Sequence, residues 1–360
     1  MQRAAGTLRA VPPAAPPAPD RVHRLELPTP FAIGPVSCWV LRGAPLTLVD
    51  PGPRRDGTRA ALEDGLRELG LRVEDVELVV LTHQHHDHVG LAAEVADRSG
   101  ARVAATPRLA AYLGDYEQAA ERDDAYAVAM MRRHGIDADT RQTLDDISRS
   151  FRRYTEGVTV DTVVGEGEQI VAGGRTFTVL ERPGHSPTDT VFLDASDGVL
   201  VGGDHLLERV SSNPIAHVPI DDRDPVDVAT GDRRRALVEY LASMRATAAL
   251  DVSAVLPGHG PAFEGHRALI ETREAMHARR ARRILRSVDG RRTATDIIAI
   301  LWRNLPVTQS YLALSEVLAH LDLLERDGLV RAVERDDGVV IWTRPPTPGP
   351  PGVRGARAAA

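Results

Sequence analysis

Short apolar runs alternate with helical patterns over residues 21–265 of the chain. The runs at 46–49 and 78–81 predict buried strands, and the apolar spacing over 58–69 predicts a helix. The remaining predicted elements are a helix over 89–98 and strands over 101–105, 158–163, 176–180, 190–193 and 199–201. Because helices separate the strands in one half and hairpins separate them in the other, we predict a layered α/β fold with mixed sheets.

Residues 107–155 interrupt this pattern with helical, charge-rich sequence that carries large side chains such as Tyr112, Tyr126 and Met131. We favour the interpretation that this insert forms amphipathic helices that cover the core. The alternative is a lid that shapes an apolar substrate pocket.

A second pattern occupies residues 278–343, next to the larger domain at 21–265. Helices are predicted from near 279, over 294–302 and over 312–326. Asp336-Asp337-Gly338 then separates two apolar runs, which is a strong hairpin signal. Three helices followed by a hairpin resemble a winged helix, so we predict a small C-terminal winged-helix domain.

The composition is that of an ordinary soluble protein, with 42% hydrophobic and 4% aromatic residues, so aliphatic side chains must fill most of the core. The net charge of −7 argues against a general nucleic-acid binder. Cys38 is the only cysteine, which excludes an intramolecular disulfide. We find no apolar run of about 18 residues and no signal peptide, so we expect a cytoplasmic protein without a membrane span. The Pro- and Ala-rich ends, 1–20 and 344–360, are predicted to be disordered tails.

The densest chemistry lies in residues 82–90, directly after a predicted strand, where four of the chain's 13 histidines fall within six residues. His83 and His85 are two residues apart and project to the same side of an extended backbone. Asp87 and His88 point apart and can serve a second ion. Imidazole nitrogen and carboxylate oxygen are ligands that zinc accepts, so we predict a metal site rather than a solvated polar turn.

Three later loops can complete such a site. His185, Asp204 and His259 each follow a short apolar run and a glycine. Glycine lets the backbone turn tightly and approach an ion. One such loop alone would more often carry an ordinary loop residue, so it is the repetition that indicates a shared site.

Together these motifs resemble those of the metallo-β-lactamase superfamily over about residues 25–265. The resemblance implies an αββα sandwich with the metal site along one sheet edge. It also implies seven metal ligands. They are His83, His85, Asp87, His88, His185, Asp204 and His259.

The family pattern divides these ligands between two divalent metal ions. The ligands of the first ion would be His83, His85 and His185. The ligands of the second ion would be Asp87, His88 and His259. Asp204 would bridge the two ions, and Asp50 would order the site from behind the ligands.

Several residues of this chain differ from those of particular branches of the superfamily, and these differences limit the branches to which we expect it to be similar. A class B1 β-lactamase would have arginine where His88 stands and a cysteine ligand late in the chain, whereas Cys38 precedes every motif. A flavodiiron-type site would have glutamate where His85 stands, which favours zinc, with iron or manganese left open. Glyoxalase II shares the ligand set but has a helical C-terminal part. The layout most resembles lactamase-like hydrolases with a C-terminal winged-helix domain.

The resemblance implies a hydroxide shared by the two ions, and we take Asp87, Asp204 and His205 as the catalytic candidates. His205 could protonate the leaving group, or it could make only a structural hydrogen bond, and both interpretations stay open. His86 is not expected to be a ligand, and His217 lies in a loop that could border the pocket.

We expect hydrolysis of a small-molecule acyl substrate, either a thioester or an ester resembling an acyl-CoA. The alternatives are a single-strand ribonuclease or phosphodiesterase, a lactonase, and a DNA-binding regulator. The predicted helix over 312–326 and the residue after it carry Glu316, Asp322, Glu325 and Asp327, which repel phosphate and argue against a nucleic-acid partner. A homodimer is compatible with a C-terminal packing module.

Overall fold

The computed structural model describes residues 21–220 and 233–345. The tail predicted over 1–20 lies outside the described residues. So does the tail predicted at the C-terminus, apart from residues 344 and 345. Among the described helices, none combines the length and hydrophobicity needed to cross a membrane.

The first sheet has six strands in sequence order. They are β1 (Val22–Leu27), β2 (Val36–Leu41), β3 (Thr47–Val49), β4 (Leu78–Val80), β5 (Arg102–Ala105) and β6 (Thr162–Val163). The first three pair antiparallel, and β3 to β6 pair in parallel. The strand predicted over 158–163 shrinks to the two residues of β6, because only this end lies beside β5.

The second sheet has five strands in the order β11-β10-β9-β8-β7. They are β7 (Gln169–Ala172), β8 (Arg175–Glu181), β9 (Thr190–Asp194), β10 (Val199–Gly203) and β11 (Ala254–Pro257). Strands β7 to β10 form an antiparallel meander, and β11 joins β10 in parallel.

Three apolar layers hold the two sheets and their helices together. On β2, Trp39 and Leu41 face the second sheet, whereas Cys38 and Val40 face the helices on the outer side. This period-2 division of a fully buried strand is what a sheet covered on both faces requires. Helices α1 (Asp56–Glu68) and α3 (Ala92–Ser99) cover the first sheet, and η1 (Val73–Asp75) leads into β4.

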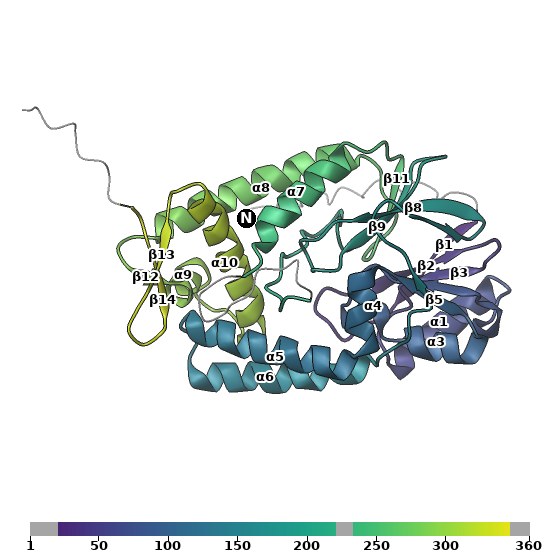
Figure 1. The fold of residues 1–360 in the computed structure, drawn as a ribbon, viewed down its shortest axis with the longest axis horizontal. Helices are drawn as coiled ribbons and strands as arrows, with labels where there is room; N and C mark the ends of the chain where they lie inside the picture. The colour runs from purple at the N-terminus through teal and green to yellow at the C-terminus, as the bar shows by residue number, and fades with distance from the viewer. Residues whose placement is uncertain (1–20, 221–232, 346–360) are drawn as a thin grey trace, which may run out of the picture.

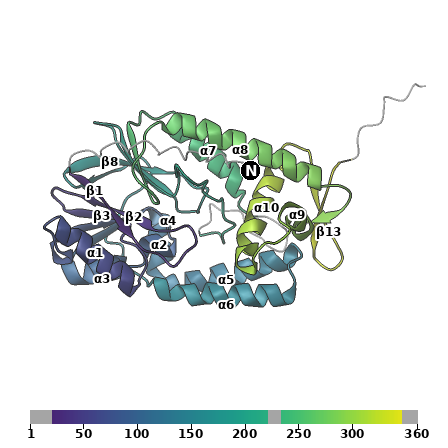
Figure 2. The ribbon, with the colours of Figure 1, turned by 180° about the vertical axis from the view of Figure 1, so that it is seen from behind.

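Helices α7 (Ala236–Ala248) and α8 (His266–Ser287) cover the outer face of the second sheet. Figures 1 and 2 show the two sheets between these helix layers, which gives the predicted αββα sandwich. Helix α8 begins at His266 and not near residue 279, and its first turns bury Ile270 in the apolar cluster that also contains Val191 and Leu200 of the second sheet. One continuous helix therefore joins the sandwich to the C-terminal part.

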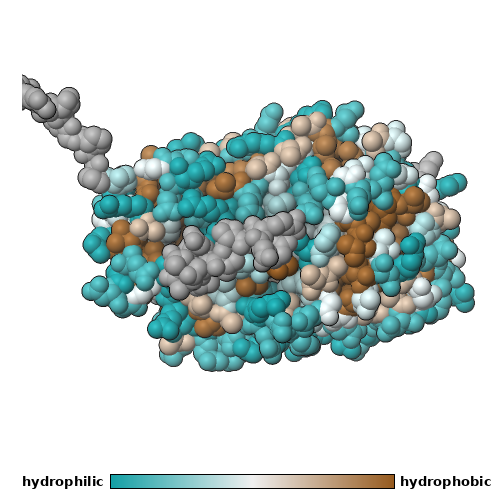
Figure 3. Space-filling model, in the orientation of Figure 1, coloured by the Kyte–Doolittle hydropathy of each residue, from teal (hydrophilic) through white to brown (hydrophobic). Residues whose placement is uncertain are grey.

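The insert forms α4 (Pro107–Gly114), α5 (Tyr116–Arg133), α6 (Ala138–Phe151) and η2 (Arg152–Tyr154). Asp137 caps α6 by accepting a hydrogen bond of 2.9 Å from the backbone N–H of Thr140. Helices α5 and α6 run side by side along one long edge of the molecule, opposite α7 and α8 (Figures 1 and 2). Their outer surface is largely hydrophilic (Figure 3), so their apolar side chains face inward.

The C-terminal part comprises β12 (Arg292–Thr293), α9 (Ala294–Leu301), η3 (Val307–Gln309), α10 (Ser310–Arg326), β13 (Arg331–Glu334) and β14 (Val340–Thr343). The hairpin predicted around Asp336-Asp337-Gly338 is present as β13 and β14. Strand β12 pairs with β14 and extends the hairpin to three strands. Helix α10 lies between the α5–α6 pair and the α7–α8 pair (Figure 1).

Candidate metal centre

The histidine-rich loop leaves the middle of the first sheet at the carboxyl end of β4. His83 is fully buried, and the short helix α2 (His86–Val89) follows at once. Gly90 ends this turn where there is no room for a side chain, because an added Cβ would lie 2.1 Å from the Tyr154 backbone oxygen. This close packing of the backbone at Gly90 fixes the orientation of α2, and with it the direction of the Asp87 and His88 side chains.

Strands of the second sheet supply the other three residues. His185, Asp204 and His259 follow the carboxyl ends of β8, β10 and β11. The glycine before His259 is required by close packing, since a Cβ on Gly258 would lie 2.2 Å from Asp204 Oδ1. Both sheets therefore deliver their polar loops to one edge of the sandwich.

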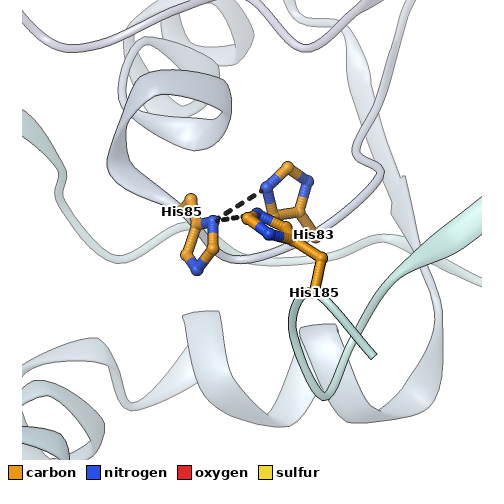
Figure 4. A group of neighbouring side chains, drawn as sticks. All are labelled: His83, His85 and His185. Carbon is orange, nitrogen blue, oxygen red and sulfur yellow. Dashed lines mark hydrogen bonds between the residues drawn. The ribbon is translucent and has the colours of Figure 1, made fainter. Parts of the chain in front are cut away.

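His83, His85 and His185 form a first metal group, with their ligand atoms pointing toward one another (Figure 4). His85 Nδ1 lies 3.1 Å from His83 Nε2 and 2.9 Å from His185 Nε2. Ligand atoms that share a tetrahedral zinc ion at its usual bond lengths lie about 3.4 Å apart. The three nitrogens are thus slightly closer than a bound ion would hold them.

Asp87, His88 and His259 form a second metal group beside the first. His259 Nε2 lies 3.4 Å from Asp87 Oδ2, and His88 Nε2 lies 4.0 Å from the same oxygen. The first separation matches that of ligand atoms around one zinc ion, and the second is slightly longer.

Asp204 lies between the two groups. Its Oδ2 is 3.6 Å from His185 Nε2 in the first group and 3.5 Å from His259 Nε2 in the second. Its Oδ1 is 3.5 Å from His88 Nε2. A carboxylate with this placement can contact ions in both groups.

The unpaired polar atoms of the site test whether metal ions fit. Within the described part of the chain, His88 Nε2, His259 Nε2 and Asp204 Oδ1 are buried and lack hydrogen-bond partners. Buried polar atoms without partners are costly and uncommon in folded proteins. Three of them facing one another, with imidazole and carboxylate chemistry, fit divalent cations as their missing partners.

The other ring nitrogen of each histidine is held from outside the site. His185 Nδ1 donates to the Asn213 carbonyl at 2.9 Å, and His259 Nδ1 donates to the Pro35 carbonyl at 2.8 Å. An N–H fixed in this way leaves the opposite nitrogen as a lone pair aimed at the site.

Asp50 orders the site from behind the ligands. Its Oδ1 accepts the Thr82 N–H at 2.9 Å, and its Oδ2 accepts the Thr82 hydroxyl at 2.6 Å and His88 Nδ1–H at 2.9 Å. Asp50 is 1% exposed and has a φ of 52°, which is costly for a residue other than glycine. Its hydrogen bonds stabilise this conformation. Because Asp50 binds Nδ1 of His88, the opposite ring nitrogen, Nε2, is left to face the metal site.

Burial and neighbouring charges set the protonation of the ligands. Burial lowers the pKa of His83 well below its usual value. Burial also opposes charge on His88, but three carboxylates, that of Asp204 foremost, raise its pKa well above the usual value. Burial opposes charge on Asp204 as well, yet His259 and His88 hold its pKa well below the usual range. Asp204 is therefore ionised, as a metal ligand must be.

His217 makes a contact that the sequence did not predict. Its Nε2 lies 3.2 Å from Nε2 of His85, on the side of that ring opposite the first metal group. His217 therefore holds the ring of His85 in place. The two histidines are 132 positions apart in the sequence, so no local signal indicated this pair.

The structure places His205 outside both metal groups. The side chain turns away from the metal groups toward α7, where Nε2 bonds the Thr247 hydroxyl at 2.9 Å and the ring packs 5.8 Å from that of Tyr240. Burial lowers its pKa to about 3, so the ring is neutral. His205 thus makes the structural hydrogen bond that was the alternative. His86 also lies outside both groups and bonds the Thr155 hydroxyl.

Comparison with known proteins decides the family. The metallo-beta-lactamase superfamily model matches residues 32–259. The chain is 31% identical over 310 residues to "Probable metallo-hydrolase YqjP" of Bacillus subtilis (strain 168), which covers 86% of this chain and 93% of that relative. The chain belongs to the metallo-beta-lactamase superfamily. A second family model, the metallo-beta-lactamase-like C-terminal domain, matches residues 282–345.

Two solved structures of this superfamily share the fold over nearly the whole chain. One is the metallo-beta-lactamase family protein TTHA1429 from Thermus thermophilus, with 26% identity and a TM-score of 0.72 over 90% of this chain and 99% of that one. The other is a beta-lactamase domain protein from Burkholderia ambifaria, with 28% identity and a TM-score of 0.74 over 92% of this chain and 93% of that one. The C-terminal part therefore belongs to an arrangement that recurs in this superfamily.

Asp50→Asn is expected to weaken zinc binding about tenfold to a hundredfold, the usual effect of losing a partner behind a metal-binding histidine. An amide N–H2 at this position cannot accept the protons of both His88 and Thr82. Competition with a chromophoric zinc chelator measures the effect. Asp56→Asn, at a fully exposed aspartate on α1, is the matched control and should bind zinc as the wild type does. Unchanged affinity in a folded Asp50→Asn protein would contradict this role.

Proposed function

We propose that this superfamily member is a metallo-hydrolase with two zinc ions, and that it cleaves a thioester or ester of a small acyl compound. The observation that carries the proposal is the pair of metal groups joined by Asp204, together with a mostly apolar cavity that His85 of the first group lines. The family and the name of the Bacillus subtilis relative support hydrolysis by a metal centre.

Bound divalent ions would supply Lewis-acid polarisation of the substrate and activation of water. The chain's own residues prepare the place for this chemistry. Asp50, Asn213 and Pro35 fix the rings of three histidines through hydrogen bonds, so little reorganisation is needed when the substrate arrives. His83 and Asp204 are buried, which excludes bulk water from the inner side of the site.

The cavity beside the site is the basis for an acyl substrate. It measures about 290 Å³, near the lower end of the range of ~300–1,000 Å³ typical of ligand pockets. His85 and His217 lie at one end, and α5, α6, η3 and α10 provide most of the rest of the wall. We call this cavity the insert chamber.

The walls of the insert chamber disfavour the ribonuclease and phosphodiesterase alternatives. None of its described lining residues is arginine, and Asp123, Asp124 and Asp145 contribute carboxyl groups. Nucleic-acid binding depends on basic groups that neutralise phosphates. An uncharged acyl group suits these walls better.

Thiol release from a panel of acyl-CoA and acyl-glutathione thioesters tests the proposal, with zinc-loaded wild-type protein, His83→Ala and His23→Ala. We expect release by the wild type and by His23→Ala, whose histidine lies on β1 away from the site. His83→Ala should release thiol at the background rate. A zinc-replete wild type that leaves every thioester and ester intact would overturn the proposal, and hydrolysis of lactones or RNA instead would identify the alternative.

A further inference from the structure

The insert chamber touches the first metal group through the ring of His85. His85 Nδ1 belongs to that group, while the same ring lines the chamber beside His217. A substrate whose reacting carbonyl lies at the metal centre could bury an extended chain past His85 in this chamber, between the insert and α10.

Apolar side chains form most of the chamber wall. They come from three helices and are Val128, Met131, Leu144, Ile147, Phe151 and Leu312. Each methylene buried against such a wall improves binding about fourfold. The wall is thus suited to an aliphatic chain.

A polar donor marks the end of the chamber at which a carbonyl would lie. Gln84 stands between His83 and His85, is 3% exposed and lines the chamber. Its Oε1 accepts a hydrogen bond from the Thr188 hydroxyl, and its buried Nε2 has no partner among the described residues. A substrate carbonyl oxygen near the metal centre would supply the missing acceptor.

The charged groups of the chamber disfavour an acyl chain that itself ends in a carboxylate. Arg152 pairs with Asp124, and Arg149 pairs with Asp145 at 3.0 Å. Asp123 accepts a hydrogen bond of 2.8 Å from the Tyr112 hydroxyl, and within the described residues no ion pair neutralises it. Burial raises the pKa of Asp123 to about 7, because a negative charge is poorly solvated at this place, and the same burial would disfavour an anionic group of the substrate beside it.

We propose that the insert chamber binds the acyl chain of the substrate and selects a medium-length, uncharged aliphatic chain over an acetyl group and over a chain that ends in a carboxylate. This selectivity rests on the proposed function for its hydrolytic readout. The chamber itself also has a binding readout that does not depend on hydrolysis.

Ala127→Phe tests the proposal by filling the chamber. Ala127 lies on α5 and lines the chamber, whereas Ala125 on the same helix is exposed and does not line it. In the zinc-loaded wild type, kcat/KM should rise about fourfold for each methylene up to the limit of the chamber. Ala127→Phe should lose about tenfold in kcat/KM on octanoyl thioester with little change on acetyl thioester. The added ring would occupy space that the octanoyl chain needs and the acetyl group does not, and the loss of the contacts of one or two methylenes in an apolar pocket alone costs about tenfold or more. Ala125→Phe should match the wild type.

Two further measurements separate failure of the chamber from failure of the hydrolase. The wild type should bind a fluorescent medium-chain fatty acid, Ala127→Phe should bind it at least several-fold more weakly, and Ala125→Phe should bind it normally. An octanoyl thioester should also be preferred over its analogue with a terminal carboxylate, and Asp123→Asn should reduce that preference. Hydrolysis that is independent of chain length, or equal probe binding by all three proteins, would overturn the chamber assignment and leave the hydrolase standing. Probe binding with the expected pattern in a protein that cleaves no ester would uphold the chamber and overturn the hydrolase.

Discussion

Replacing Asp204 with asparagine is expected to lower hydrolytic activity about a thousandfold, since a bound metal contributes several kcal/mol to transition-state stabilisation and each ~1.4 kcal/mol is a factor of ten. Asp204 lies within 3.6 Å of ligand atoms in both metal groups, so its loss affects both at once. Asparagine keeps the shape of the side chain but removes the negative charge. Steady-state rates at saturating zinc, together with the zinc content of the purified variant, measure the effect.

Asp97→Asn is the control for this variant, because Asp97 is an exposed residue of α3 and belongs to neither metal group. It should retain wild-type activity and zinc content. An Asp204→Asn protein that keeps two zinc ions and more than a tenth of the wild-type rate would contradict a role for Asp204 in joining the two groups.

Removal of metal by a chelator is expected to lower the thermal unfolding midpoint by about 10 °C, because a ligand present at about a thousand times its Kd contributes roughly 4 kcal/mol and each kcal/mol shifts a domain of this size by about 2–4 °C. Without ions, His88, His259 and Asp204 keep buried atoms that lack partners. Differential scanning fluorimetry with and without chelator measures the shift, and added zinc should restore the original midpoint.

The Asp204→Asn protein is the comparison for this experiment. Its midpoint should respond to the chelator by only a few degrees, because it holds metal weakly before any chelator is added. Equal unfolding midpoints for the wild type with and without chelator would contradict the prediction. They would show that the buried polar atoms of His88, His259 and Asp204 do not need metal ions as partners.

Much of the site could be predicted from the sequence because its signals are local. The apolar run before Thr82 fixes a strand, and the run that follows it puts His83, His85, Asp87 and His88 within one turn of its end. The same strand-then-glycine pattern precedes His185, Asp204 and His259. Parallel pairing and one sandwich edge then bring these loops together.

The direction of a side chain within a loop was less predictable. Asp204 and His205 are neighbours in sequence, yet the first faces the metal groups and the second bonds Thr247 on α7. The contact of His217 with His85 also depends on two loops that are far apart in the chain. Neither outcome has a periodic signal, because each follows from how separate elements pack.

The start of α8 shows a similar limit. Its first turns, from His266, carry too few apolar residues to stand out, and the helix was expected only from near 279. In the fold, Ile270, Ala281 and Ile284 lie in one apolar cluster with residues of the second sheet and of the C-terminal helices, and α8 contacts α7 as well as α9 and α10. The apolar face of one helix is thus divided between two partners, which hides its length in the sequence.

The sequence by itself determined the layered α/β class, the candidate metal-ligating residue types and the loops that carry them. Strand periodicity and ligand chemistry can both be recognised from residues that are neighbours in the sequence. Only the tertiary structure decided that Asp204 lies between the two groups, that His205 stays outside them, and that the insert and α10 enclose an apolar chamber beside His85. These features join segments up to about two hundred residues apart, and their geometry depends on packing between sheets and helices that no single stretch of sequence specifies.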